Sequence, residues 1–196
     1  MNVVGPFSFF LLLCWTNMLL CSSDGSGRAS PSAASPSGLA TMWSVCSASA
    51  RRLHEEVSIL SNKPLANCSA APNGDDLFHW TATVEGPLGT PYAGGIFFLQ
   101  IEFFPDYPFT PPKVHFDTRI YHCNVTSQGL VLLDMLGDGW SPVVTVRDLL
   151  ASICAMLVAD CKPSSRCLSR SITKQFLQQR NQYDATARLW TLRYAT

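Results

Sequence analysis

The sequence predicts an α+β fold in which helices pack on one face of an antiparallel sheet. Three observations lead to this prediction. A helical repeat of apolar residues occurs between residues 51 and 60, segments with a period of two follow between residues 77 and 117, and a helical repeat returns after residue 145. The chain has 196 residues, which is enough for one domain with a substantial core and an extension.

The first 48 residues are predicted to be an extension, separate from a domain at residues 49–196. Residues 22–38 are mostly Ser, Ala, Gly and Pro, a composition that predicts disorder. Residues 7–20 are mostly apolar and are typical of a signal-peptide core, but no Lys or Arg precedes them. Because this run is also short for a membrane helix, we expect no stable membrane span.

The first helix of the domain is predicted from apolar residues at positions i, i+4 and i+7, and Pro64 ends it. Its apolar residues are Leu53, Val57 and Leu60, and the charged residues around them are Arg51, Arg52, Glu55 and Glu56.

Strict alternation then predicts three strands, at residues 77–84, 97–103 and 113–117. The clusters "PNGDD", "GPLGTPYAGG" and "FPDYPFTPP" mark turns around them. Short links of this kind are typical of neighbouring antiparallel strands.

Two amphipathic helices are predicted after Pro142. Thr145 and Asp148 have the spacing of a capping box, with Asp in place of Glu. The apolar stripe that follows consists of Val146, Leu149, Leu150, Ile153 and Leu157, and the later one of Tyr183, Ala187, Trp190 and Tyr194. The irregular stretch before the helices, residues 118–141, is long for a structureless loop, and such loops are usually functional.

Composition excludes several classes of function. The formal net charge is zero and no basic stripe is present, so we expect no binding to nucleic acid. The eight cysteines form no C-x-x-C pair. We therefore expect free thiols, with no metal site and no cofactor.

Several motifs then resemble the ubiquitin-conjugating enzyme family. They are "YPFTPPK", "YHCN", "DGWSP" and the ending "ARLWTLRYAT", in this order and spacing. The "YHCN" variant and the ending are similar to the subgroup with a Ser-rich N-terminal extension. The resemblance covers roughly residues 47–196 and implies the family's fold, with a four-stranded antiparallel sheet, an N-terminal helix and C-terminal helices. It also implies transfer of ubiquitin to lysine through a cysteine thioester.

The family's reactive cysteine corresponds to Leu132, within "GLVLLD", and a leucine side chain cannot form a thioester. The resemblance assigns Asn124 to the amide that stabilises the oxyanion and gives Asp134 a supporting role. Cys123 is an alternative nucleophile, but the similar subgroup has a cysteine there beside a separate reactive one. We interpret Cys123 as a structural residue of the loop.

A second departure concerns the acid that the family places near the incoming lysine. That position corresponds to Ser165, or to Arg166 if one residue is inserted nearby. Neither residue can serve as this acid, so we expect catalysis to be impaired here as well.

The resemblance also implies binding surfaces. It places the ligase-binding surface, for ligases of the RING or HECT type, at Arg52, Phe109, Ser141, Pro142 and Val144. Ser69 corresponds to the centre of the opposite face, where some members bind ubiquitin non-covalently. Glu55 replaces a common Lys that meets the ubiquitin-activating enzyme and ligases, so docking of both is expected to be weaker but not lost.

Two hypotheses follow. The first is an inactive member of the ubiquitin pathway that retains its binding surfaces, and the second is an active conjugating enzyme that uses another cysteine such as Cys123. The resemblance places the protein in cytoplasm or nucleus. Secretion remains an alternative, because the apolar N-terminus is accompanied by glycosylation triplets at Asn67 and Asn124.

Overall fold

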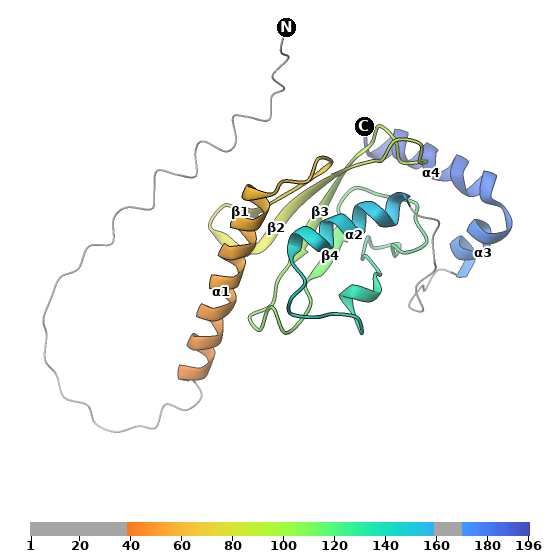
Figure 1. Cartoon of the computed structure of the whole chain (residues 1–196). Helices are drawn as coiled ribbons and strands as arrows, with labels where there is room; N and C mark the ends of the chain where they lie inside the picture. Colours follow the sequence, from red (N-terminus) through yellow and green to blue (C-terminus); the bar gives the residue numbers. More distant parts are fainter. Residues whose placement is uncertain (1–38, 159–169) are drawn as a thin grey trace, which may run out of the picture. The chain divides into compact units, whose positions relative to one another are not determined.

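The structure is a computed structural model, and it describes residues 39–158 and 170–196. Figure 1 shows the elements of this part of the chain. Its helices are α1 (Leu39–Asn62), α2 (Val146–Val158), α3 (Arg170–Gln178) and α4 (Arg180–Tyr194), with a short 3₁₀ helix, η2, at Asp134–Leu136. Its strands are β1 (Cys68–Asn73), β2 (Asp76–Glu85), β3 (Ile96–Glu102) and β4 (Lys113–Phe116).

The strands form one antiparallel sheet in the order β1-β2-β3-β4. The α+β prediction is confirmed, as are the three strands predicted by alternation. Strand β1 is an addition to that pattern. Its sequence, CSAAPN, contains small residues and a proline, so it has no apolar alternation that would mark it as a strand. An edge position tolerates the proline, because it leaves fewer ladder hydrogen bonds to lose.

The core lies between the sheet and the helices. Alternate strand residues, such as Trp80, Val84, Leu99 and Ile101, are fully buried, while Thr81, Thr83 and Phe98 lie on the other face. Helix α1 packs against α2 and against strands β1 and β2. The predicted apolar stripe of α2 is buried in full. Figure 1 shows α2 crossing the sheet, with α4 near one end of it.

Two predictions about the first helix need correction. Helix α1 begins at Leu39, inside the segment that was expected to be an extension. Glu56 was grouped with the polar residues around the apolar stripe, but its side chain is 0% exposed. The carboxylate is stabilised in this position because several donors surround it.

The prediction of free thiols is wrong for three cysteines. A disulfide joins Cys68 of β1 to Cys154 of α2, across 86 positions of sequence. Cys123 is also disulfide-bonded. Among the described residues, no helix is long and apolar enough to cross a membrane. The apolar run at residues 7–20 lies outside them.

Candidate functional site

The segment that contains Leu132 folds back on itself, and this brings Leu132 next to Asn124. Val125 and Val131 form an antiparallel bridge, and the Leu132 N–H donates to the Asn124 carbonyl at 2.8 Å. The two positions are therefore neighbours in space, whereas the roles that the resemblance gives them stay predictions. The pairing depends on backbone atoms, so it places no demand on the side chain at position 132.

Gly129 makes the turn of this segment possible. Its φ is +87°, and a Cβ at this position would lie 2.4 Å from the Phe116 carbonyl oxygen. A residue with a side chain would be strained by the backbone angle and would collide with β4. The close approach of the two backbones allows the Phe116 N–H to donate to the Gly129 carbonyl at 2.9 Å, and this hydrogen bond attaches the turn to the sheet.

A buried histidine holds the start of the same loop. His122 Nδ1 accepts a hydrogen bond from the Asn124 N–H at 3.0 Å, and Nε2 lies 3.3 Å from the Met156 carbonyl. This arrangement fits a neutral imidazole with its proton on Nε2. Burial lowers the pKa of His122 to about 4, an effect that the Met156 carbonyl only partly offsets. At neutral pH the side chain is therefore an uncharged structural anchor of the loop.

The remaining residues assigned to the chemistry differ in exposure. Leu132 is half-buried, while Asn124 is 6% exposed and Cys123 is 1% exposed. Asp134 is exposed at the start of η2, and its backbone carbonyl accepts hydrogen bonds from the N–H groups of Gly137 and Gly139. Ser165 and Arg166 lie outside the described residues.

Four of the predicted ligase-binding residues lie in two loops, which the hydrogen bond from Trp140 Nε1 to the Pro108 carbonyl joins. Phe109 follows β3 and is 77% exposed. Ser141, Pro142 and Val144 precede α2, where the Val144 N–H donates to the Ser141 carbonyl at 3.0 Å. Val143, between them, is 79% exposed. The sequence reasoning missed Val143, because two valines stand side by side after Pro142 and no pattern in the sequence marks which of them is exposed.

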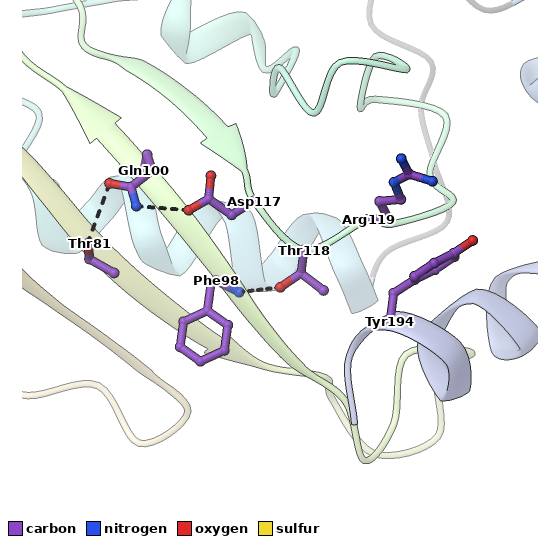
Figure 2. Close-up of a pocket in the computed structure, with 7 residues that line it drawn as sticks. All are labelled: Thr81, Phe98, Gln100, Asp117, Thr118, Arg119 and Tyr194. Atoms are coloured by element: carbon purple, nitrogen blue, oxygen red, sulfur yellow. Dashed lines mark hydrogen bonds between the residues drawn. The ribbon is translucent and has the colours of Figure 1, made fainter.

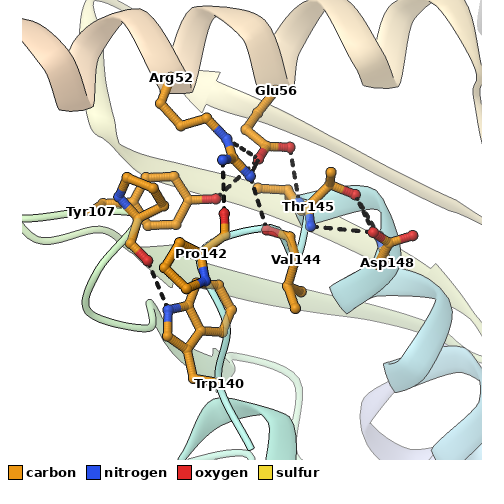
Figure 3. A network of polar contacts seen from close by, with 10 residues as sticks. Arg52, Glu56, Tyr107, Trp140, Pro142, Val144, Thr145 and Asp148 are labelled. Atoms are coloured by element: carbon orange, nitrogen blue, oxygen red, sulfur yellow. Dashed lines mark hydrogen bonds and ion pairs between the residues drawn. The ribbon is translucent and has the colours of Figure 1, made fainter.

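Arg52 has a different position from the other residues of this surface. Its side chain is 21% exposed, and its guanidinium donates to the carbonyls of Pro142 and Val144 at 2.8 and 3.0 Å. It also pairs with buried Glu56, as Figure 3 shows. Glu55, by contrast, is exposed on the outer side of α1.

Ser69 lies on the opposite face of the sheet, where it is exposed. Its hydroxyl is 2.6 Å from that of Thr83, and Thr83 pairs with Phe98 on the next strand. Phe98 also lines a shallow groove, which Figure 2 shows. The groove is lined by Thr81, Phe98, Gln100, Asp117, Thr118, Arg119 and Tyr194. The Arg119 guanidinium stacks over the ring of Tyr194, 5.6 Å from its centroid.

Comparisons with known proteins agree with this architecture. The sequence matches the family model described as ubiquitin-conjugating enzyme over residues 52–191. Among solved structures, the chain is similar to the E2 domain of a ubiquitin conjugating enzyme from Toxoplasma gondii, with 38% sequence identity and a TM-score of 0.66. That match covers 74% of this chain and 98% of the other. The chain therefore belongs to the ubiquitin-conjugating enzyme family, and its sheet and helices form that family's fold.

Proposed function

We propose that this protein is an inactive member of the family that acts by binding ubiquitin ligases. The observation that carries the proposal is Leu132 at the position of the nucleophile. A thioester needs a sulfur nucleophile, and an aliphatic side chain supplies none. The ligase-facing loops, in contrast, present Phe109 and Val143 to solvent.

Cys123 gives little support to the alternative of an active enzyme. Its side chain is buried and disulfide-bonded, so it offers no exposed thiolate to an incoming ubiquitin. Asn124 remains beside Leu132, and an oxyanion donor without a nucleophile cannot start acyl transfer. Binding is therefore the activity that these residues support best.

A protein that binds ligases without carrying ubiquitin should act as a competitor. We expect increasing amounts of this protein to slow ubiquitin transfer by an active conjugating enzyme and a RING ligase. Phe109→Ala should relieve the inhibition, because exposed aromatic residues dominate interfaces of this kind. Leu88→Ala is the matched control, since Leu88 is more exposed still, at 92%, but lies in the loop between β2 and β3.

The outcome that contradicts the proposal is also clear. Catalysis would be established if this protein, in place of the active enzyme, transferred ubiquitin faster than a reaction without any conjugating enzyme. Equal inhibition by the wild type and Phe109→Ala would show that the surface around Phe109 does not cause the inhibition.

For the compartment, we propose cytoplasm or nucleus, where the family works. One observation favours the secretory alternative: the Cys68–Cys154 disulfide is of a kind that persists in oxidising compartments. The two glycosylation triplets allow a test, because Asn67 is exposed and Asn124 is buried.

We expect no glycan on the protein when it is expressed in cells, so treatment with a glycosidase should leave its mobility on a gel unchanged. Asn67→Gln is the informative variant. A shift in mobility that this substitution abolishes would place the protein in the secretory pathway.

A further inference from the structure

A buried carboxylate connects three segments of the chain beneath the ligase-facing loops. Glu56 of α1 accepts hydrogen bonds at Oε1 from Arg52 Nε at 2.8 Å and from the Tyr107 hydroxyl at 3.1 Å. Its Oε2 accepts the Val146 N–H at 2.9 Å. The three segments are therefore α1, the loop after β3 and the start of α2, as Figure 3 shows.

The second oxygen of Glu56 fixes where α2 begins. The first N–H groups of a helix have no partner within it, and a negative charge at that end is favourable. Glu56 supplies both an acceptor and a charge to Val146. Thr145 and Asp148 complete the cap, with the Asp148 N–H donating to Thr145 Oγ1 at 3.1 Å and the Thr145 N–H donating to Asp148 Oδ2 at 3.2 Å.

Arg52 extends this network to the loop before α2. Nη1 donates to the Pro142 carbonyl and Nη2 to the Val144 carbonyl, while the same guanidinium pairs with Glu56. Only the planar guanidinium has enough donors in a fixed geometry to reach these acceptors together. A lysine ammonium retains the charge but has one nitrogen.

The loop after β3 is attached from the other side. Tyr107 donates to Glu56, and burial raises the pKa of its hydroxyl far above the ordinary value, with the Glu56 charge as a further cause. The hydroxyl therefore remains a donor at every physiological pH. Trp140 Nε1 donates to the Pro108 carbonyl at 2.8 Å, which joins this loop directly to the segment before Ser141.

We infer that Arg52 and Glu56 are positioning residues, which hold Phe109 and the Pro142–Val144 turn in a binding-ready arrangement before any ligase arrives. The inference rests on the proposed function, because it concerns the same ligase surface. Phe109 and Val143 are the exposed side chains of the two loops, while Glu56 is fully buried. A surface that is ordered in advance loses less conformational entropy on binding.

The test compares Arg52→Lys with the matched control Arg51→Lys, which changes an exposed residue on the same helix. Hydrogen exchange of the Val144 and Val146 amides reports the order of the turn without any ligase. We expect both amides to exchange at least about tenfold faster in Arg52→Lys. A tenfold change in the local opening equilibrium corresponds to the loss of about one hydrogen bond's net stabilisation. The melting temperature should change by only a few degrees.

The same variants are then tested with the purified RING domain that binds the wild type best among a panel. Arg52→Lys should weaken this binding about tenfold, through the same loss of order, while Arg51→Lys should bind as the wild type does. Glu56→Gln is the second variant, and it should also accelerate exchange at Val146. Unchanged exchange in both Arg52→Lys and Glu56→Gln would overturn the inference, as would faster exchange with unchanged RING binding.

Failure of the proposed function gives a different result. If no RING domain binds the wild type, the ligase surface is refuted, whereas the exchange rates still decide whether Arg52 and Glu56 order the turn.

Discussion

The loop around Leu132 and the surface around Phe109 are supported in different ways. The loop is held by backbone hydrogen bonds, a glycine and a neutral histidine. The surface is held by a buried ion pair and charge-assisted hydrogen bonds. In the first region, these hydrogen bonds do not depend on which side chain stands at position 132. In the second, removal of a single charged group would leave buried partners without hydrogen bonds.

This difference explains how the side chain at position 132 can vary without loss of the fold. The Leu132 N–H makes its contact whatever the side chain is, so a leucine is tolerated there. The network of Arg52 and Glu56 offers no such freedom, because each nitrogen of the guanidinium and each oxygen of the carboxylate has a hydrogen-bond partner.

The largest effect we predict is a loss of stability in acid, due to His122. The unfolded-state pKa is about 6.5, and the folded-state pKa is about 4. Above pH 6.5 both states are neutral, so the contribution is constant. As the pH falls from 6.5 to 4, only the unfolded state gains the proton, and the free energy of unfolding decreases by about 3 kcal/mol.

Denaturant titrations between pH 7 and 4 measure this loss. His122→Gln should flatten the profile over this range, while the exposed control His54→Gln should leave it unchanged. A profile for His122→Gln with the slope of the wild type would show that other groups control the acid sensitivity.

The next effect concerns the turn of the same loop. Gly129→Ala should reduce the free energy of unfolding by about 2 kcal/mol, because it combines backbone strain with a collision against β4. Gly94→Ala is a matched control with a φ of +82° and open space around the Cβ, and it should cost about 1 kcal/mol. Equal losses in the two variants would mean that the close approach to Phe116 is unimportant.

The smallest effects on stability are expected at Phe109 and Leu132, the two side chains on which the proposed function rests. Phe109→Ala should change the free energy of unfolding by no more than about 0.5 kcal/mol, since the ring is mostly exposed. Leu132→Cys removes part of a half-buried side chain and should cost no more than about 1 kcal/mol. Chemical denaturation of both variants checks this, and a larger loss for Leu132→Cys would show that the leucine has a packing role.

Sequence patterns predicted the elements whose burial is periodic. The strands around Trp80, Leu99 and Val114 and the stripe of α2 follow from alternation and helical spacing, because one face of each is buried. The capping box at Thr145 was also predictable, since its partners are three residues apart. Alternation did not predict strand β1, because an edge strand with small residues has no apolar pattern. The four-stranded sheet that the family resemblance implied is confirmed.

The burial of Glu56 could not be predicted from the sequence, for a different reason. The donors to its carboxylate come from positions 52, 107 and 146, and only the first is close in sequence. The i,i+4 spacing of Arg52 and Glu56 is typical of exposed helix pairs, so it gave no indication of a buried one. The Cys68–Cys154 bond was missed similarly, because it depends on the packing of α2 against β1.

The most direct test of the central claim is a charging assay with ubiquitin-activating enzyme, ATP and ubiquitin. We predict that the wild type forms no adduct that a reducing agent removes. Leu132→Cys should gain such an adduct, because Asn124 and the surrounding turn are already in position. Transfer from Leu132→Cys to lysine should remain slow, since acid–base assistance typically contributes about 10²- to 10⁴-fold and neither Ser165 nor Arg166 supplies it.

Addition of Ser165→Asp, or of Arg166→Asp in the other register, should then increase transfer to lysine more than charging. If Leu132→Cys is not charged at all, Glu55→Lys tests whether weak docking of the activating enzyme is the cause. A thiol-sensitive adduct on the wild type that Cys123→Ser abolishes would contradict the account, because it would show an active enzyme with a relocated nucleophile.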